Sequence, residues 1–166
     1  MKKNNKGITL ITLVLTVTVI FILASIAIPT GSDLIIKTRV NRYISIMYLM
    51  KIEAEKIYEN YEFDSESTYF TVNSTASEIV DINGIMNLLS SEEKSLVISS
   101  GTWYKWNKNT LDYLNIDSSN IIKNEDDEFF CVNYETGEVL YNNGIIINNN
   151  QDIRYTLTGL IDYENK

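Results

Sequence analysis

Residues 8–28, ITLITLVLTVTVIFILASIAI, form 21 consecutive positions without a charged side chain. At 1.5 Å of rise per residue, a helix of this length extends about 31 Å, which matches the hydrocarbon thickness of a lipid bilayer. The cationic stretch MKKNNKG precedes it, and Pro29 follows it. The segment therefore predicts a membrane-spanning helix to which the rest of the chain is attached.

Two common kinds of N-terminal segment share some of these features. A secretory signal peptide has an apolar core of about 7 to 15 residues, shorter than this one, although the small residues at 25–27 would satisfy its cleavage rule. A single-span anchor, held on the cytoplasmic side by the lysines of the leader, fits better. Neither explains the order of a lysine-rich leader, a glycine, an immediate apolar helix and a proline 22 residues after the glycine.

This order resembles the N terminus of type IV pilins and of the pseudopilins of type II secretion and competence systems. The matching stretch runs from Lys6 to Pro29 and reads KGITLITLVL, then an apolar helix, then AIP. The resemblance implies that a prepilin peptidase cuts after Gly7 and methylates Ile8, where the family more often has phenylalanine. It also implies a bend or local unwinding at Pro29, because a proline removes one helical hydrogen bond and clashes with the preceding turn.

One position departs from the family pattern. The fifth residue of the mature chain is Thr12, where most members have a glutamate thought to neutralise the methylated amine of a neighbouring subunit. Threonine cannot counter a charge, and its hydroxyl instead bonds to a carbonyl one turn back, as we also expect for Thr9, Thr16 and Thr18. The resemblance therefore favours a minor or initiating subunit over a major shaft subunit. The other interpretation is that this lineage tolerates Thr12.

Beyond Pro29 the helical period continues as one apolar seam. Spacings of four and three residues join Ile36, Val40, Tyr43, Met47, Met50, Ala54, Ile57 and Tyr61. This pattern is typical of an amphipathic helix. We expect one helix from near Ile8 to near Tyr61, broken only around 29–32, with its seam packed under the chain's own head. A dimeric coiled coil is the alternative.

The remaining residues, 63–166, suffice for one modest hydrophobic core. We divide the chain into a cleaved leader (1–7), a transmembrane and assembly half-helix (8–29), an amphipathic half-helix (30–62) and a globular head (63–166). The predicted fold class is α+β and pilin-like: a long N-terminal helix packed on a small antiparallel sheet with short helices.

Local patterns place the elements of the head. Short helices are expected over 81–89, from Ser90 to Ile98 with Glu93 at capping-box spacing, and from Asn107 or Asn109 through Leu114. Strands at 129–134 and 138–141 should form a hairpin that turns at Gly137 and ends at 142–144. A third strand is expected at 145–147 or 154–157, and a short one at 69–72. WYKWNK (103–108) and NYETGEVLY (133–141) also look like the heads of prepilin-like proteins from low-GC Gram-positive bacteria.

The charge distribution agrees with a protein displayed outside a bacterial cell. All 22 acidic residues follow Pro29, and three of the 14 basic ones lie in the leader, so the mature chain has a net charge of −11. An acidic head repels phosphate backbones, and we expect no direct nucleic-acid binding. The cationic leader predicts a single-pass protein with its head outside the membrane, later part of an extracellular filament.

Catalytic chemistry has few candidates, and we expect no enzyme. The chain has no histidine, and Cys131, its only cysteine, has neither an activating partner nor a disulfide partner. In a β-prone run this cysteine is expected to be a small buried apolar residue. No phosphate-binding glycine loop is present among the seven glycines.

Two segments are weak candidates for binding. One is an acidic run whose oxygens suit calcium, although its spacing is not that of an EF-hand and a solvated turn is the favoured interpretation; it comprises Glu125, Asp126, Asp127 and Glu128. The other comprises Trp103, Tyr104 and Trp106, which would form either a contact platform or, by preference, aromatic packing against the sheet. No cofactor is expected otherwise.

Two classes of function remain. The first is a structural subunit of a type IV pilus-like or type II secretion or competence pseudopilus filament, whose partners are the prepilin peptidase, other pilin subunits, the membrane, and the assembly platform with its ATPase. The second is a membrane-anchored extracellular binding domain that does not polymerise.

Overall fold

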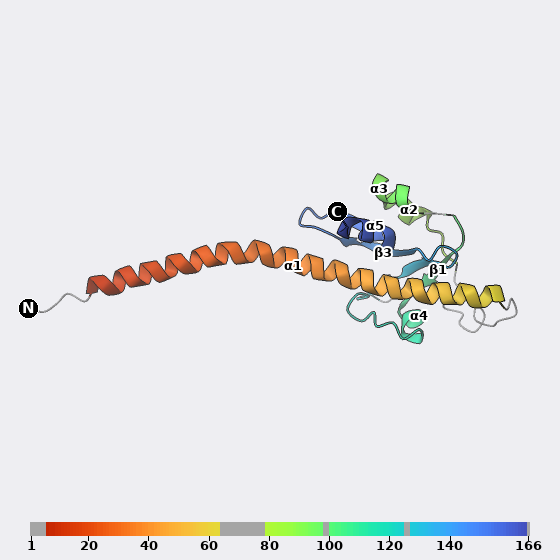
Figure 1. Ribbon diagram of the computed structural model, residues 1–166, viewed down its shortest axis with the longest axis horizontal. Helices are drawn as coiled ribbons and strands as arrows, with labels where there is room; N and C mark the ends of the chain where they lie inside the picture. The colour runs from red at the N-terminus through yellow and green to blue at the C-terminus, as the bar shows by residue number, and fades with distance from the viewer. Residues whose placement is uncertain (1–5, 64–78, 98–99, 125–126, 166) are drawn as a thin grey trace, which may run out of the picture.

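The computed structural model describes residues 6–63, 79–97, 100–124 and 127–165, and, within the N-terminal helix, the side chains of residues 11–22, 31 and 33–60. That helix, α1 (Lys6–Phe63), has 58 residues and is about 87 Å long at the usual helical rise. Its first half projects from the head and its second half lies along the head (Figure 1). With a small antiparallel sheet, α1 gives the α+β architecture that the sequence predicts.

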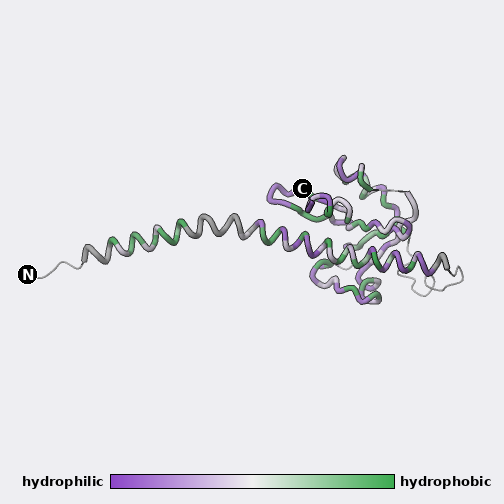
Figure 2. Tube along the Cα trace, viewed as in Figure 1, coloured by the Kyte–Doolittle hydropathy of each residue, from purple (hydrophilic) through white to green (hydrophobic). Residues whose placement is uncertain are grey.

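The predicted interruption of the helix at 29–32 is wrong. The backbone of α1 remains helical through Pro29 and Ser32, and the helix bows gently along its length instead (Figure 1). A proline withholds one N–H from the helical ladder, and a long helix can accommodate this by bending. Figure 2 shows the change of character along α1: the coloured part of the projecting half is mostly apolar, whereas apolar and polar residues alternate beside the head.

Four antiparallel strands form the sheet, in the order in which they occur in the chain. They are β1 (Trp103–Trp106), β2 (Phe130–Asn133), β3 (Val139–Ile146) and β4 (Ile153–Thr156). Helices α2 (Asn83–Leu88) and α3 (Ser91–Leu96) precede β1, α4 (Lys108–Tyr113) follows it, and α5 (Leu157–Glu164) follows β4. The sequence pattern predicts neither β1 nor α5. The strand predicted at 69–72 lies outside the described residues.

Side-chain caps begin three of the short helices. Ser90 accepts the N–H three residues ahead at 3.1 Å, and Asn107 and Thr156 do the same at 3.0 and 2.8 Å. Each bond satisfies a donor that a helix N terminus leaves unpaired. The predicted caps at Ser90 and Asn107 are confirmed, and α2 lies within the helix predicted at 81–89.

The β2–β3 hairpin turns at Gly137, which has a φ of +66°, a value that glycine adopts without strain. The predicted end of the second strand at 142–144 is wrong, because β3 continues to Ile146. The Asn142 side chain accepts the N–H of Phe129 at 3.0 Å and donates to the carbonyl of Asp127 at 2.7 Å. The Asn142 side chain therefore stabilises β3 rather than ending it. The third strand, predicted at 145–147 or 154–157, corresponds to the last residues of β3 and to β4, which pair with each other.

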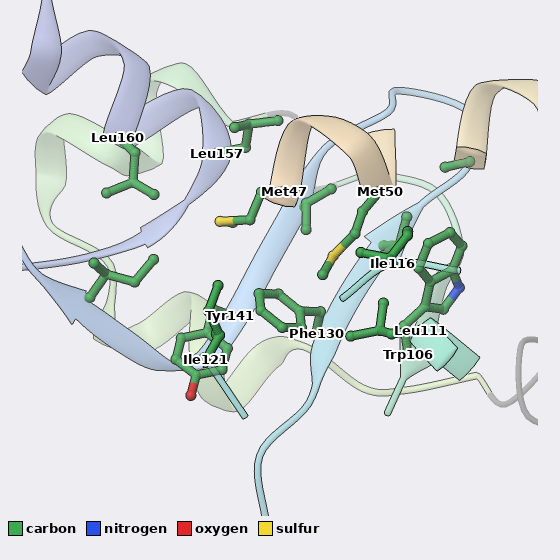
Figure 3. Packing of buried hydrophobic residues seen from close by; sticks show 14 of the residues in the cluster. Met47, Met50, Trp106, Leu111, Ile116, Ile121, Phe130, Tyr141, Leu157 and Leu160 are labelled. Carbon is green, nitrogen blue, oxygen red and sulfur yellow. The ribbon is translucent and has the colours of Figure 1, made fainter. Parts of the chain in front are cut away.

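The seam of α1 lies on one face of the sheet. Five of its predicted members are buried: Val40, Met47, Met50, Ala54 and Ile57. Figure 3 shows Met47 and Met50 over Phe130, with Leu111, Ile116 and Trp106 beside them. Ile36 and Tyr43 are partly buried against the same cluster. Packing under the chain's own head is thus confirmed, and each buried valine, isoleucine or methionine of the seam contributes about 1.5–3 kcal/mol by burial.

Residues of β2 and β3 alternate between the two faces of the sheet. Phe130 and Val132 join the cluster under α1, whereas Cys131, between them, joins a smaller cluster with Ile82 and Leu89 from the α2 region. This period of two is the ordinary geometry of a strand. The sheet is therefore covered by α1 on one face and by α2 and its flanking residues on the other.

Candidate functional site

The exposed part of α1 is the most distinctive surface of the molecule. All residues from 11 to 22 are exposed, and nine large apolar side chains among them keep 43–71% of their surface accessible. Thr16 and Thr18 donate their hydroxyls to the carbonyls of Leu13 and Val14, at 2.9 and 2.6 Å, so the two bonds predicted there are confirmed. We call residues 11–22 the apolar rod. A helix that is apolar on every side requires lipid or other helices around it.

The predicted processing and assembly residues all lie on α1. The helix begins at Lys6, so the Gly7–Ile8 peptide bond lies in its first turn. Thr12 is exposed at the start of the apolar rod, and Pro29 lies between the rod and the head. Cleavage, methylation and assembly through these residues stay predictions.

Within the part of the chain that the structure describes, no helix is both long and apolar enough to cross a membrane.

Two grooves flank α1 where it enters the head. The first has a volume of about 660 Å³ and lies between α1, the β3–β4 loop and the end of α5, with Asp33, Lys37 and Glu164 among its lining residues. The Asn149 amide donates to the Asp33 carboxylate, which fastens the β3–β4 loop to α1. The second, of about 480 Å³, lies between α1 and residues 120–123. We call it the basic groove, because its charged lining residues are Arg39, Arg42 and Lys123.

The acidic run at 125–128 is only partly within the described residues, since Glu125 and Asp126 lie outside them. Asp127 accepts a hydrogen bond from the Asn124 amide at 2.6 Å. Glu128 accepts the N–H of Lys123 at 2.6 Å. Among the described residues, no group of three histidine, cysteine, aspartate or glutamate side chains is arranged to hold a metal ion.

The aromatic residues at 103–106 form a strand of the sheet and belong to the core. Trp103 and Trp106 are buried, and the Trp106 indole N–H donates to the Tyr134 hydroxyl at 2.9 Å. The rings of Tyr104 and Tyr134 stack with centroids 4.3 Å apart. The expectation of aromatic packing is confirmed, and the exposed platform is wrong because both indoles face inward.

A buried carboxylate, Glu93, joins α3 to β4 and α5. Its side chain is fully buried, and its Oε1 accepts the N–H groups of Tyr155 and Thr156 at 2.9 and 3.2 Å and the Thr156 hydroxyl at 3.1 Å. Oε2 lies 4.0 Å from Nη1 of Arg154. Because β4 donates to this carboxylate, Glu93 also closes that edge of the sheet against further strands. The sequence indicates only its spacing from the cap at Ser90, and no local pattern signals the contact with β4.

Burial also shifts the pKa values of Glu138 and Cys131 from their ordinary values. Burial raises the pKa of the Glu138 carboxyl, although hydrogen bonds from the Thr158 hydroxyl and N–H partly oppose this. Cys131 is fully buried in the cluster with Ile82 and Leu89, so the small buried apolar role predicted for it is confirmed. This burial raises the pKa of its thiol to about 12. Both groups support the packing of the head, and neither is accessible enough for chemistry.

Comparison with known proteins points to fimbriae. Two curated fimbrial proteins of Pseudomonas aeruginosa are each 38% identical to this chain over 87 residues, which cover 49% of the chain and 56% of the relative. The chain thus spans about half the length of the curated relatives it matches. No family model and no solved structure matches it. The similarity and the architecture together support a pilin-like family.

Proposed function

We propose that this chain is a structural subunit of an extracellular pilus-like filament. The observation that carries the proposal is the apolar rod, which projects from the head with exposed apolar side chains on every side. The similarity to fimbrial proteins supports the same function. In this proposal the head is displayed on the filament surface and the rod lies in its core.

The rod needs two apolar environments in succession. Burying one large apolar side chain is worth about 1.5–3 kcal/mol, so nine exposed ones make water an unfavourable surrounding for the rod. Before assembly, residues 8–29 lie in the bacterial cell membrane, with the head outside. During assembly the rod exchanges lipid for the rods of neighbouring subunits, and packing between helices rather than the hydrophobic effect drives this exchange.

Processing precedes assembly. A prepilin peptidase cleaves after Gly7 and methylates Ile8, and the assembly platform with its ATPase then draws the subunit from the membrane. Thr12 offers no charge for the methylated amine of a neighbour, so we place this chain among minor or initiating subunits of a pilus or of a type II secretion or competence pseudopilus.

Two measurements test the proposal. Mass spectrometry of the mature protein should give an N-terminal peptide that starts at Ile8 and carries one methyl group; an uncut Met1 or a chain starting at Ile28 would contradict the processing. Cysteines at Leu13 and Ile22, whose side chains are 62% and 56% exposed, should cross-link neighbouring subunits in filaments. Correct processing without these cross-links would favour a membrane-anchored binding domain that does not polymerise.

A further inference from the structure

Three exposed cations lie together at one place on the head. Several cations pair with carboxylates: Lys51, Lys56, Lys108 and Arg154. The three cations of the basic groove, Arg39, Arg42 and Lys123, are exposed, and none of them forms an ion pair with a described carboxylate. In a mature chain with a net charge of −11, such a cluster is a local exception that suits an acidic partner.

The basic groove also offers apolar contact. Leu34 and Ile35 line it beside the two arginines and keep 60% and 63% of their surface exposed. The Asp117 carboxylate accepts the N–H and hydroxyl of Ser119 at 3.1 and 2.7 Å. These bonds are the main cause that lowers the pKa of Asp117, and Arg42 contributes less. The groove therefore suits a partner that presents carboxylates next to apolar surface.

The opposite end of the head carries the complementary charge. Among the described residues 53–60, three side chains are acidic and one is basic. Glu59 is exposed, and Glu55 has its cation, Lys51, at 3.8 Å. The β2–β3 turn, which carries the exposed Glu135, lies beside the Lys51–Glu55 pair, because a Cβ at Gly137 would be 3.0 Å from the Glu55 carboxylate and 3.1 Å from the Lys51 side chain. We call Glu55, Glu59 and Glu135 the distal acidic patch.

We infer that the basic groove of one subunit binds the distal acidic patch of the next copy along the filament. The two surfaces lie at different positions along α1: Arg42 and Glu59 are 17 residues apart in sequence, which corresponds to about 26 Å of helix. A contact between two different surfaces of identical chains is heterologous, and such contacts build open helical assemblies. The proposed contact also places positive charge between heads that are equally acidic and would otherwise repel one another.

This inference rests on the proposed function, since it requires a filament. An anionic membrane is the other source of negative charge near the basic groove, which lies where α1 enters the head. The second copy is the better partner, because the chain itself carries a carboxylate-rich surface at the far end of the same helix, beside the partly exposed Tyr58.

Charge reversal in the full chain tests the contact. We expect Arg39→Glu with Arg42→Glu to reduce filament yield about tenfold, since like charges placed opposite each other cost at least 1.4 kcal/mol. Glu55→Lys with Glu59→Lys should have a similar effect, and all four changes together should restore most of the yield. Lys94→Glu is the matched control: it reverses an exposed cation on α3, away from the groove, and should leave the yield unchanged.

Cross-linking locates the contact directly. Two differently tagged chains, one with Thr38→Cys and the other with Glu59→Cys, should form a mixed cross-linked dimer in filaments, whereas Lys94→Cys with Glu59→Cys should not. Tryptophan fluorescence and thermal unfolding of each variant in detergent confirm that the head is folded.

Two results would overturn the inference while leaving the proposed function intact. In the first, the rod cysteines at Leu13 and Ile22 cross-link, but the groove cross-link is missing and charge reversal leaves filaments unaffected. In the second, the arginine variants assemble normally but lose binding to phosphatidylglycerol vesicles, which would assign the groove to lipid. If the unmodified chain forms neither filaments nor rod cross-links, both proposals fail together.

Discussion

Replacing Glu93 with alanine is expected to lower the free energy of unfolding of the head by about 3–5 kcal/mol. The change removes the acceptor of three hydrogen bonds, from the N–H groups of Tyr155 and Thr156 and from the Thr156 hydroxyl. Each buried donor left without a partner costs about 1–3 kcal/mol. The sum of these costs is an upper limit, because water can enter the space left by the truncated side chain.

Glu93→Gln separates the role of the acceptor from that of the charge. The amide oxygen can accept the same three bonds, but bonds to a neutral group are about half as strong as bonds to a carboxylate. We therefore expect this variant to lose less than half of the stability that the alanine variant loses. Glu92→Gln is the matched control, because Glu92 is largely exposed and pairs with Arg154 at the surface.

Urea unfolding followed by tryptophan fluorescence measures these differences. Both tryptophans of the chain, Trp103 and Trp106, are buried in the head, so the signal reports the head and not the apolar rod. Full-length protein in detergent is suitable. If Glu93→Ala unfolds within 1 kcal/mol of the unmodified chain, the hydrogen bonds at Glu93 do not hold α3 to β4, and the reasoning from its burial is refuted.

Three other predictions concern the same head. Gly159→Ala should destabilise it by about 2–3 kcal/mol in the urea assay, because the added Cβ would lie 2.6 Å from Oε1 of Glu93; an unchanged midpoint would contradict this. Burial raises the pKa of Glu138 above its ordinary 4.5. The contribution of Glu138 to the stability of the head is therefore present below pH 4.5 and decreases as the pH rises through the raised pKa. Glu138→Gln should flatten the dependence of the unfolding free energy on pH in that window. An unaltered slope would show that Glu138 does not cause it. Cys131, with its pKa raised to about 12 by burial, should react with iodoacetamide at pH 8 only after unfolding; equal rates with and without urea would disprove its burial.

Features of the fold that depend on residues close together in the sequence could be predicted from the sequence. The seam of α1 follows from the helical period, and Met47 and Met50 are buried as that period requires. The caps at Ser90 and Asn107 follow from side chains that bond three residues ahead. The turn at Gly137 follows from the need for a positive φ.

Features decided by distant partners could not be predicted in the same way. Strand β1 exists because Trp103 to Trp106 pair with Asn133 to Phe130, which lie 24 to 30 residues further along the chain. The continuation of β3 through Asn142 depends on bonds to residues 127 and 129. The capping-box pattern assigns Glu93 to the N terminus of α3, but Tyr155 and Thr156 of β4 donate to its carboxylate instead. Tertiary contacts decided each of these cases, and a single sequence carries no record of them.

The end of α5 has a practical consequence for labelling. Tyr163 and Glu164 line the same groove as Asp33 and Lys37, close to where α1 leaves the head. In the proposed filament, an affinity tag or fluorescent protein fused behind α5 would thus lie against α1 where it leaves the head and would obstruct incorporation of the subunit. A dye attached through Gly84→Cys avoids this obstruction, because a side chain added there would meet nothing within 4 Å. Imaging of live filaments should therefore use this position on α2 rather than a C-terminal fusion.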